Sequence, residues 1–343
     1  MKSLIFLLSF LILILFFIIN IFLGSVHIPI LNIIQILWQP EPENQTWVNI
    51  LYKIRIPRAF TAILAGVALS LSGLQMQTLF RNPLAGPSVL GISSGASMGV
   101  ALVVLGSGSW LGQGSFGLLW VGGEWLIISA AFVGAAAVMG IILLVSFRVR
   151  DNVVLLIVGM MVGAFASALV GIWQYFSHPE SLQNYVIWTF GSLAGVTARQ
   201  LEILVPVVIL GIVASFSLIK ILNVLLLGEN YARSSGLNIL RSRLYIITIS
   251  ALLTGSVTAF CGPISFVGIA VPHLARGLFK TSDHSVLIPA CALLGSIFML
   301  FCDVLSKLPY SSAGLPINIM TSLIGAPLVI LIIMRNKNLK TAF

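Results

Sequence analysis

Long apolar runs, separated by short polar segments, dominate the chain. A run of about 20 apolar residues can cross roughly 30 Å of hydrocarbon as a helix, and ten such runs are present. Backbone amides in hydrocarbon must be hydrogen-bonded within the segment, so each run predicts a transmembrane helix. The predicted spans are residues 4–23, 57–79, 88–106, 124–147, 153–176, 201–220, 243–262, 264–279, 286–305 and 316–335. The pattern therefore predicts an all-α polytopic membrane protein with ten transmembrane helices.

The first span and the boundary near Pro263 need additional criteria. The apolar run from Leu4 to Leu23 follows Lys2. It is longer than a signal-peptide core of roughly 7–15 residues, and no A-x-A cleavage site follows, so we expect a retained helix. Near residue 263, Cys-Gly-Pro divides a run that is too long for one crossing. Proline suits the first turn of a helix, so a new span is expected to begin there.

Three connecting segments are longer than tight turns. Residues 24–52 contain the amphipathic pattern HIPILNIIQILW, and residues 180–198 contain NYVIWTFGSL, which is apolar enough for a half-buried helix. Residues 221–242 have the sequence ILNVLLLGENYARSSGLNILRS. Binding residues concentrate in loops that a rigid scaffold positions, so we expect functional sites in these segments.

The composition supports a membrane location. Hydrophobic residues make up 59% of the 343 residues and charged residues only 8%, whereas soluble domains carry about 25% charged residues. A net charge of +9 would suggest a nucleic-acid partner in a soluble protein, but no basic stretch here is interleaved with exposed aromatic residues. The cysteines lack CxxC spacing and are expected to be buried, unreactive thiols; they are Cys261, Cys291 and Cys302.

The distribution of basic residues sets the orientation. Ten crossings place both termini on one side, and thirteen of the eighteen Lys and Arg residues then fall on that side. They are Lys2, Arg81, Arg148, Arg150, Lys220, Arg233, Arg241, Arg243, Arg276, Lys280, Arg335, Lys337 and Lys340. The positive-inside rule therefore places both termini in the cytoplasm, and Lys53, Arg55, Arg58, Arg199 and Lys307 outside.

Several kinds of chemistry are missing from the sequence. No G-x-x-x-x-G-K-[ST] loop, HExxH or GxSxG motif occurs, and the four histidines are scattered. None of the nine acidic residues falls at the centre of a predicted span, where ion-coupled carriers usually place an ionisable group. The sequence therefore argues against secondary transport and membrane catalysis, and the energy for transport would come from another subunit.

The glycine-rich stretch RNPLAGPSVLGISSGASMGV, residues 81–100, is predicted to be a turn followed by a packing helix. Asn82 and Pro83 are expected to end one helix and Pro87 to begin the next. Gly91, Gly95 and Gly99 are four residues apart and are therefore expected on one face of this helix, a spacing that lets helix backbones approach closely in lipid. We expect Gly95→Leu to damage assembly more than affinity.

Four stretches resemble one family of membrane proteins. They are RIPRAFTAILAGVALSLSGLQMQTLFRNPLAGPSVLGISSGA (55–96), LLLGENYARSSGL (225–237), GPISFVGIAVPHLAR (262–276) and LPINIMTSLIGAPLVIL (315–331). Together and in this order they resemble the permease subunits of type II ABC importers for iron–siderophore, haem and vitamin B12. The resemblance implies a homo- or heterodimer of permeases, two cytoplasmic ATPases that bind ATP and Mg, and an extracytoplasmic substrate-binding protein. It implies the bacterial inner membrane and no cofactor or metal bound by this chain.

The resemblance also implies a docking site for the binding protein at the outer mouth of the second span. Arg55 and Arg58 match arginines that pair with carboxylates of the binding protein, and Lys307 matches a third position that is often arginine. The planar guanidinium suits bidentate pairing with a carboxylate. The simpler alternative is that these side chains anchor the helix at the lipid headgroups.

Residues 221–242 resemble the coupling helices that fit a cleft on each ATPase. Gly228 and Gly236 would bound a short helix, with Leu227 and Tyr231 forming a small apolar face. The full set of expected coupling residues is Leu227, Gly228, Glu229, Tyr231, Ala232 and Arg233. The alternative is an ordinary interfacial loop.

The translocation path and gate follow from the resemblance alone. The path is expected along the fifth span, at Met160, Met161, Ser167 and Gln174, and in residues 184–193. The cytoplasmic gate is expected at Arg150, Asp151, Asn152 and Val153. His273, beside a proline, is interpreted as a packed residue that bonds carbonyls freed by the kink, and Arg276 as an inside anchor or ATPase contact.

Two classes of function compete for this chain. The first is the permease of an ATP-driven importer, with a ferric siderophore as the expected cargo because it is the commonest cargo of the family, and haem or vitamin B12 as alternatives. The second is a secondary carrier or channel of the same topology. Dependence of uptake on an ATPase separates the two classes.

Overall fold

The computed structural model describes residues 2–38, 44–106, 115–149, 151–308 and 314–335, and within these ranges no residue is assigned to a strand. Ten helices coincide with the ten predicted spans. They are α1 Lys2–Phe22, α4 Ile56–Phe80, α5 Ile92–Val104, α6 Ser115–Arg148, α7 Asn152–Phe176, α9 Ala198–Ser217, α12 Ile239–Cys261, α13 Val267–Phe279, α14 His284–Lys307 and α15 Ile317–Arg335. The prediction of an all-α polytopic fold is therefore confirmed.

Shorter helices occupy the predicted connecting segments. They are α2 Ile30–Trp38, α3 Gln45–Ile50, α8 Pro179–Thr189, α10 Ile219–Leu226 and α11 Glu229–Ser234. A five-residue π-helix, Leu51–Arg55, joins α3 to α4, so the helical segment from Gln45 to Phe80 is continuous and longer than predicted. Seven helical segments of the described chain are long and apolar enough to cross a membrane, whereas α5, α13 and the apolar part of α15 are shorter.

Two of the short spans begin later than predicted because glycines with positive φ interrupt the chain. Residues 87–90 form a 3-10 turn, and Gly91 at φ 76° separates it from α5, so the predicted helix 88–106 begins at Ile92. Gly262 at φ 74° ends α12, and Phe266 is also left-handed. Pro263 therefore lies in a connection, and the predicted span 264–279 begins at Val267.

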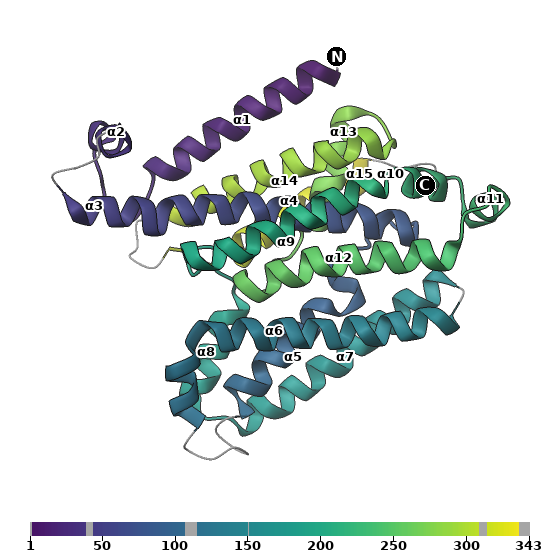
Figure 1. The fold of residues 1–343 in the computed structure, drawn as a ribbon, viewed down its shortest axis with the longest axis horizontal. Coiled ribbons are helices and arrows are strands. Elements are labelled where there is room, and N and C mark those ends of the chain that lie inside the picture. The colour runs from purple at the N-terminus through teal and green to yellow at the C-terminus, as the bar shows by residue number, and fades with distance from the viewer. Residues whose placement is uncertain (1, 39–43, 107–114, 150, 309–313, 336–343) are drawn as a thin grey trace.

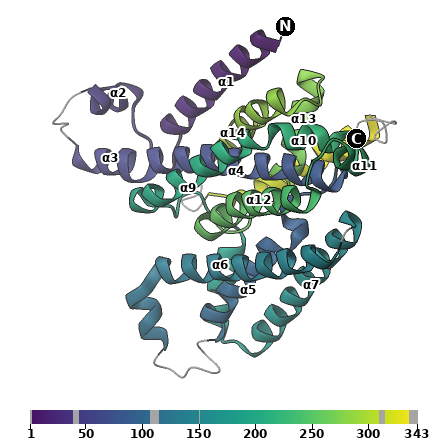
Figure 2. The same cartoon turned by 45° about the vertical axis from the view of Figure 1, so that its right-hand side comes forward.

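The helices form two groups, and α4 lies in the interior of one of them (Figures 1 and 2). One group contains α4, α9, α12, α13 and α14, and the other contains α5, α6 and α7. Helix α12 joins the groups by packing against both α4 and α6. In the most apolar window of α4, 89% of the residues are buried, against 11% in α1. Helix α4 is thus enclosed by protein, while α1 lies at the edge of the molecule.

Small residues explain how α4 can be enclosed so tightly. A Cβ atom added to Gly66 would lie 2.2 Å from the carbonyl oxygen of Gly295 on α14, and one added to Gly73 would lie 1.8 Å from that of Gly268 on α13. Contacts this short require glycine. Lipid gives no hydrophobic drive for association between spans, so close backbone approach of this kind provides the packing energy.

Helix α11 lies on the right in Figure 1, α2 and α8 lie on the left, and the N-terminal end of α1 is nearer to the α11 side than its other end is. The positive-inside rule assigns the first end to the cytoplasm and the second to the outside. These two ends are called the inner and outer ends below.

Candidate functional site

The predicted coupling segment 221–242 folds as two short helices, α10 and α11, that meet at a sharp turn. Gly228 adopts φ 104°, a conformation that other residues rarely take, and it changes the chain direction between them. Leu227 therefore ends α10 instead of sharing a helix face with Tyr231, contrary to the predicted i, i+4 pair. Both side chains are nevertheless exposed, Leu227 at 63% and Tyr231 at 55%, whereas Ala232 is buried.

Helix α10 is fixed to the start of α14 by polar contacts. Asn223 accepts a hydrogen bond from the backbone N–H of His284 at 2.9 Å and donates one to Asp283 at 2.8 Å. Asp283 also caps α14 by accepting bonds from the hydroxyl and backbone N–H of Ser285. These bonds stabilise the charged carboxylate and lower the pKa of Asp283 to about 2. The base of the coupling segment is therefore attached to the body of the protein.

The start of α7, where the gate is predicted, faces α11. Asp151 caps α7 by accepting a hydrogen bond from the backbone N–H of Val153 at 2.7 Å. The next residue, Asn152, donates from Nδ2 to the carbonyl of Leu79 at 2.9 Å and to Glu229 Oε1 at 2.5 Å. The fourth predicted gate residue, Arg150, lies outside the described residues.

A pocket of about 750 Å³ at the inner end brings the predicted coupling and gate residues together. Its lining comes from the end of α4, the start of α7 and the α10–α11 turn, namely Phe80, Arg81, Asp151, Asn152, Val153, Leu227, Gly228, Glu229, Asn230 and Tyr231. The two predicted sites, which are far apart in the sequence, are thus walls of one pocket. Ala232 and Arg233 do not line it; Arg233 lies 3.8 Å from Glu229 as an exposed i, i+4 ion pair.

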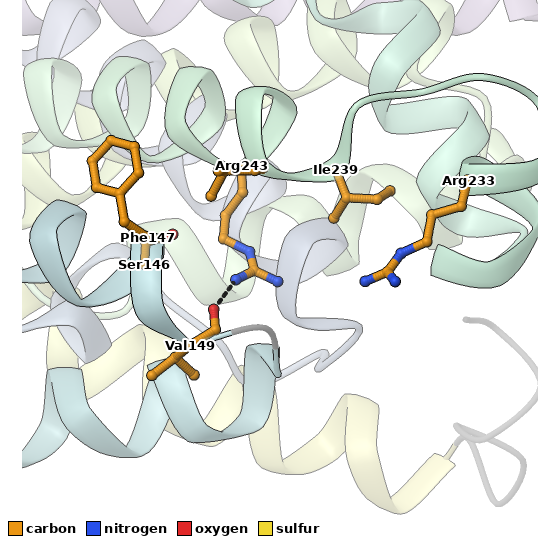
Figure 3. Close-up of a pocket in the computed structure, with 7 residues that line it drawn as sticks. Ser146, Phe147, Val149, Arg233, Ile239 and Arg243 are labelled. Carbon is orange, nitrogen blue, oxygen red and sulfur yellow. Dashed lines mark hydrogen bonds between the residues drawn. The ribbon is translucent and has the colours of Figure 1, made fainter.

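Arg243 on α12 also belongs to this region, although the sequence gave it no functional role. Its side chain is 3% exposed, lies 3.7 Å from Glu229, and donates from Nη1 to the carbonyl of Val149 at 2.7 Å. Figure 3 shows this contact at the edge of a second pocket, of about 340 Å³, which Arg233 also lines. Arg241, two residues away, has the same charge, so the sequence offers no signal that singles out Arg243.

At the outer end, Arg58 and Lys307 converge on one buried carboxylate. Asp303 is fully buried; its Oδ1 accepts from Arg58 Nε at 2.7 Å, and its Oδ2 lies 2.9 Å from Lys307 Nζ. Arg58 also donates to Ser306, and Lys307 donates to Asn20 on α1 at 2.7 Å. These residues form the outer cluster, which ties α1 and α4 to α14.

Arg55 lies in the interior, contrary to the exposed position that docking would require. It is 4% exposed, and its guanidinium donates to the carbonyls of Ile21, Phe22 and Val26. These carbonyls lie at and beyond the end of α1, where backbone acceptors lack helical partners, so Arg55 satisfies the end of that helix. The side chain of Lys307 is only 7% exposed, whereas Arg58 keeps 21%. Of the three predicted docking residues, Arg58 alone reaches the surface appreciably.

The predicted path residues lie on α7. Met160 and Met161 are 42% and 60% exposed, Ser167 is also exposed and Gln174 is half-buried. The predicted segment 184–193 corresponds to the second half of α8 and the turn that follows it. The translocation path therefore stays a prediction. In the single chain, Met160, Met161 and Ser167 lie on an exposed face of α7.

The predicted glycine face divides between two helices. Cβ atoms added to Gly95 and Gly99 would lie 2.6 Å and 2.1 Å from backbone oxygens of α6, at Gly134 and Ala130. Gly91, in contrast, precedes α5 and faces α7 at Gly159, so the expectation of one common face is wrong. Because the backbone of Gly91 is left-handed, Gly91 is not part of helix α5. The four-residue spacing therefore does not place it on the face that carries Gly95 and Gly99.

The remaining candidate side chains make contacts within the bundle. His273 is buried as expected, but it bonds the carbonyl of Pro83 at 2.8 Å, in the turn after α4, and not a carbonyl freed by the kink beside it. Arg276 is partly exposed and donates to Gln77 at 2.6 Å, and its role as an inside anchor or ATPase contact stays a prediction. The three cysteines are buried as expected. Within the described ranges, no group of three His, Cys, Asp or Glu side chains could hold a metal ion.

Comparisons of the sequence with known proteins give full-length similarities. A family model described as the FecCD transport family matches residues 12–335. The hemin transport system permease protein of Yersinia pestis is 34% identical over 321 residues, which cover 92% of each chain. The vitamin B12 import system permease protein of Salmonella paratyphi A is 36% identical over 288 residues, 83% of each chain.

A solved structure shares the fold. An ABC transporter of the metal-chelate type, captured in an inward-facing conformation, superposes with a TM-score of 0.83 at 29% sequence identity. The match covers 96% of this chain and 99% of that chain. The structural similarity therefore extends over nearly the whole bundle.

Proposed function

Because this chain belongs to the FecCD transport family and is an ABC importer permease, we propose that it forms the translocation path for a metal chelate, driven by ATP hydrolysis on separate subunits. The observation that supports this proposal most directly is the inner pocket of about 750 Å³. There the exposed apolar side chains of Leu227 and Tyr231 stand beside the first turn of α7. An ATPase that covers α11 would thus lie next to the helix that carries the predicted path.

The proposed complex has two permeases, two ATPases that bind ATP and Mg, and an extracytoplasmic binding protein, in a bacterial inner membrane. The second permease, identical or different, would cover the exposed face of α7 and leave the path between the two copies. The relatives transport hemin and vitamin B12, and the structural relative is of the metal-chelate type. Within this class we propose an iron chelate, with a ferric siderophore as the first cargo to test.

Uptake by reconstituted complexes tests the function and the cargo together. The permease is co-purified with its ATPase, placed in proteoliposomes, and supplied with a ferric hydroxamate siderophore, haemin or cyanocobalamin on loaded binding protein. We expect the complex to import one of these cargoes in an ATP-dependent manner. Replacing the lysine in the nucleotide-binding loop of the ATPase should stop this uptake. Uptake that continues without the ATPase would contradict the proposal and favour a secondary carrier or channel.

Docking of the binding protein is proposed to involve Arg58, the partly exposed member of the outer cluster. Arg58→Gln should weaken binding roughly tenfold, as expected for loss of one charged contact, measured on complexes in nanodiscs. Arg199→Gln is the matched control, because Arg199 is exposed on the outer side and belongs to no cluster described above. Equal affinity of Arg58→Gln and the control would contradict the docking role.

A further inference from the structure

One carboxylate at the inner end connects α11 to two structural elements of the bundle. Glu229 Oε1 accepts a hydrogen bond from Asn152 Nδ2 at 2.5 Å and lies 3.7 Å from Arg243 Nη2. Asn152 Nδ2 also donates to the carbonyl of Leu79 at 2.9 Å, and Arg243 Nη1 donates to that of Val149 at 2.7 Å. The residue after α6 and the first residue of α7 are therefore both linked to Glu229.

These contacts are arranged for a fixed geometry. The side chain of Arg243 is 3% exposed and lies 3.7 Å from that of Glu229, which is 25% exposed, so the two charges form a partly buried ion pair. Hydrogen bonds to charged groups are shorter and stronger than neutral ones, and a low local dielectric strengthens them further. Helix α11 packs against α10 and α12, so the Glu229–Asn152 bond is its direct side-chain link to α7.

We propose that the Glu229–Asn152 hydrogen bond, braced by Arg243, transmits movement of α11 to the first turn of α7. This inference rests on the proposed function, in which an ATPase moves α11. Asn152 and Arg243 are positioning residues in this scheme, because they act through α7 and α11. Helix α7 carries the proposed path residues Met160 and Met161, so a shift of its first turn reaches the path along a single helix.

The space beside the relay allows such a shift. The pocket of about 340 Å³ in Figure 3 borders Val149 and Arg243, and Arg233 faces it from the α11 side. The pocket of about 750 Å³ is lined by Asn152 and Val153 in the first turn of α7. This side of the turn thus has room to move, whereas Leu155 on its other side is fully buried in the hydrophobic core.

The test compares cargo imported per ATP hydrolysed in proteoliposomes, with whichever of the three cargoes above the wild-type complex imports. Asn152→Leu removes the donor to Glu229 and should lower this ratio roughly tenfold, the effect of losing a hydrogen bond to a charged group. Glu229→Gln keeps an acceptor for Asn152 and loses only the charge, so a fall of roughly threefold is expected.

The control is Asn82→Leu, the same substitution in a nearby inner turn. The side chain of Asn82 accepts a hydrogen bond from the backbone N–H of Leu84 in its own turn and takes no part in the proposed relay, so the ratio of this variant should equal that of the wild type. An unchanged ratio in Asn152→Leu overturns the relay while wild-type uptake leaves the importer function standing. If Asn152→Leu does not assemble, Asn152→Asp decides, because it keeps the size of the side chain but removes the amide donor to Glu229, and an unchanged ratio there overturns the relay. Absence of ATP-dependent uptake in the wild type would overturn the proposed function itself.

Discussion

The outer and inner polar clusters use similar residues in opposite surroundings. At the outer end, Asp303 is fully buried between Arg58 and Lys307, and its contacts hold α1 and α4 against α14. At the inner end, Glu229 keeps 25% exposure and lines the pocket of about 750 Å³, while its partners Arg233 and Arg243 line the pocket of about 340 Å³. A closed cluster fixes helices in place, whereas a cluster bordered by open space can move as a unit. The difference suggests that the outer cluster serves assembly and the inner one serves coupling.

The largest effect is expected from Asp303→Ala, which leaves the buried Lys307 and the partly exposed Arg58 without their shared carboxylate. Breaking a buried ion pair by removing one partner costs about 3–5 kcal/mol. Thermal unfolding of the purified protein in detergent measures the loss. Glu202→Ala is the control, because Glu202 is an exposed acidic residue near the outer end of α9 and should change stability by less than about 0.5 kcal/mol. Equal midpoints for the two variants would show that the outer cluster is not a structural clamp.

An intermediate effect is expected from Arg243→Gln at the inner end. The shorter, neutral side chain loses the bond to the Val149 carbonyl and the attraction to Glu229. Hydrogen bonds of charged groups contribute about 1.5–3 kcal/mol, so unfolding should be easier than in the wild type but harder than in Asp303→Ala. A loss as large as that of Asp303→Ala would erase the contrast between the clusters.

The smallest effect is expected from Arg233→Gln, which addresses the same carboxylate from the solvent side. The Glu229–Arg233 pair is an i, i+4 contact at 3.8 Å with 53% of the arginine exposed. Exposed helix pairs of this kind contribute roughly 0.3–0.5 kcal/mol, so the unfolding midpoint should hardly change. If Arg233→Gln destabilised the protein as much as Arg243→Gln, burial would not be what separates the two arginines.

The hydropathy pattern, together with the prolines and glycines that mark helix ends, predicted most of the helical architecture. The ten runs matched helices because span length and apolar composition are properties of each segment alone. The predicted amphipathic pattern at 27–38 contains α2, and the predicted half-buried segment at 184–193 overlaps α8, which begins earlier, at Pro179. The errors fell at Gly91 and Pro263, where a left-handed glycine delays the helix beyond the expected first turn.

The candidate sites were only partly predictable. The family motifs predicted coupling residues in 227–233 and gate residues in 150–153, and the structure brings several of these residues together at one pocket. The sequence did not predict the direction in which each charged side chain points. Arg55 and Arg58 are three residues apart in one motif, yet one binds the end of α1 and the other reaches Asp303, 245 residues away.

The sequence by itself determined the membrane environment, the number and order of the helices, the inner and outer ends, and the family. These follow from local composition, charge bias and contiguous motifs, all of which are present before the chain folds. Only the tertiary structure decided which charges are buried, that Asn152 meets Glu229 across 77 residues, and that Gly91 faces a different helix from Gly95. Such contacts depend on how each helix is rotated about its axis and where it lies relative to the others. Packing among all the helices sets both.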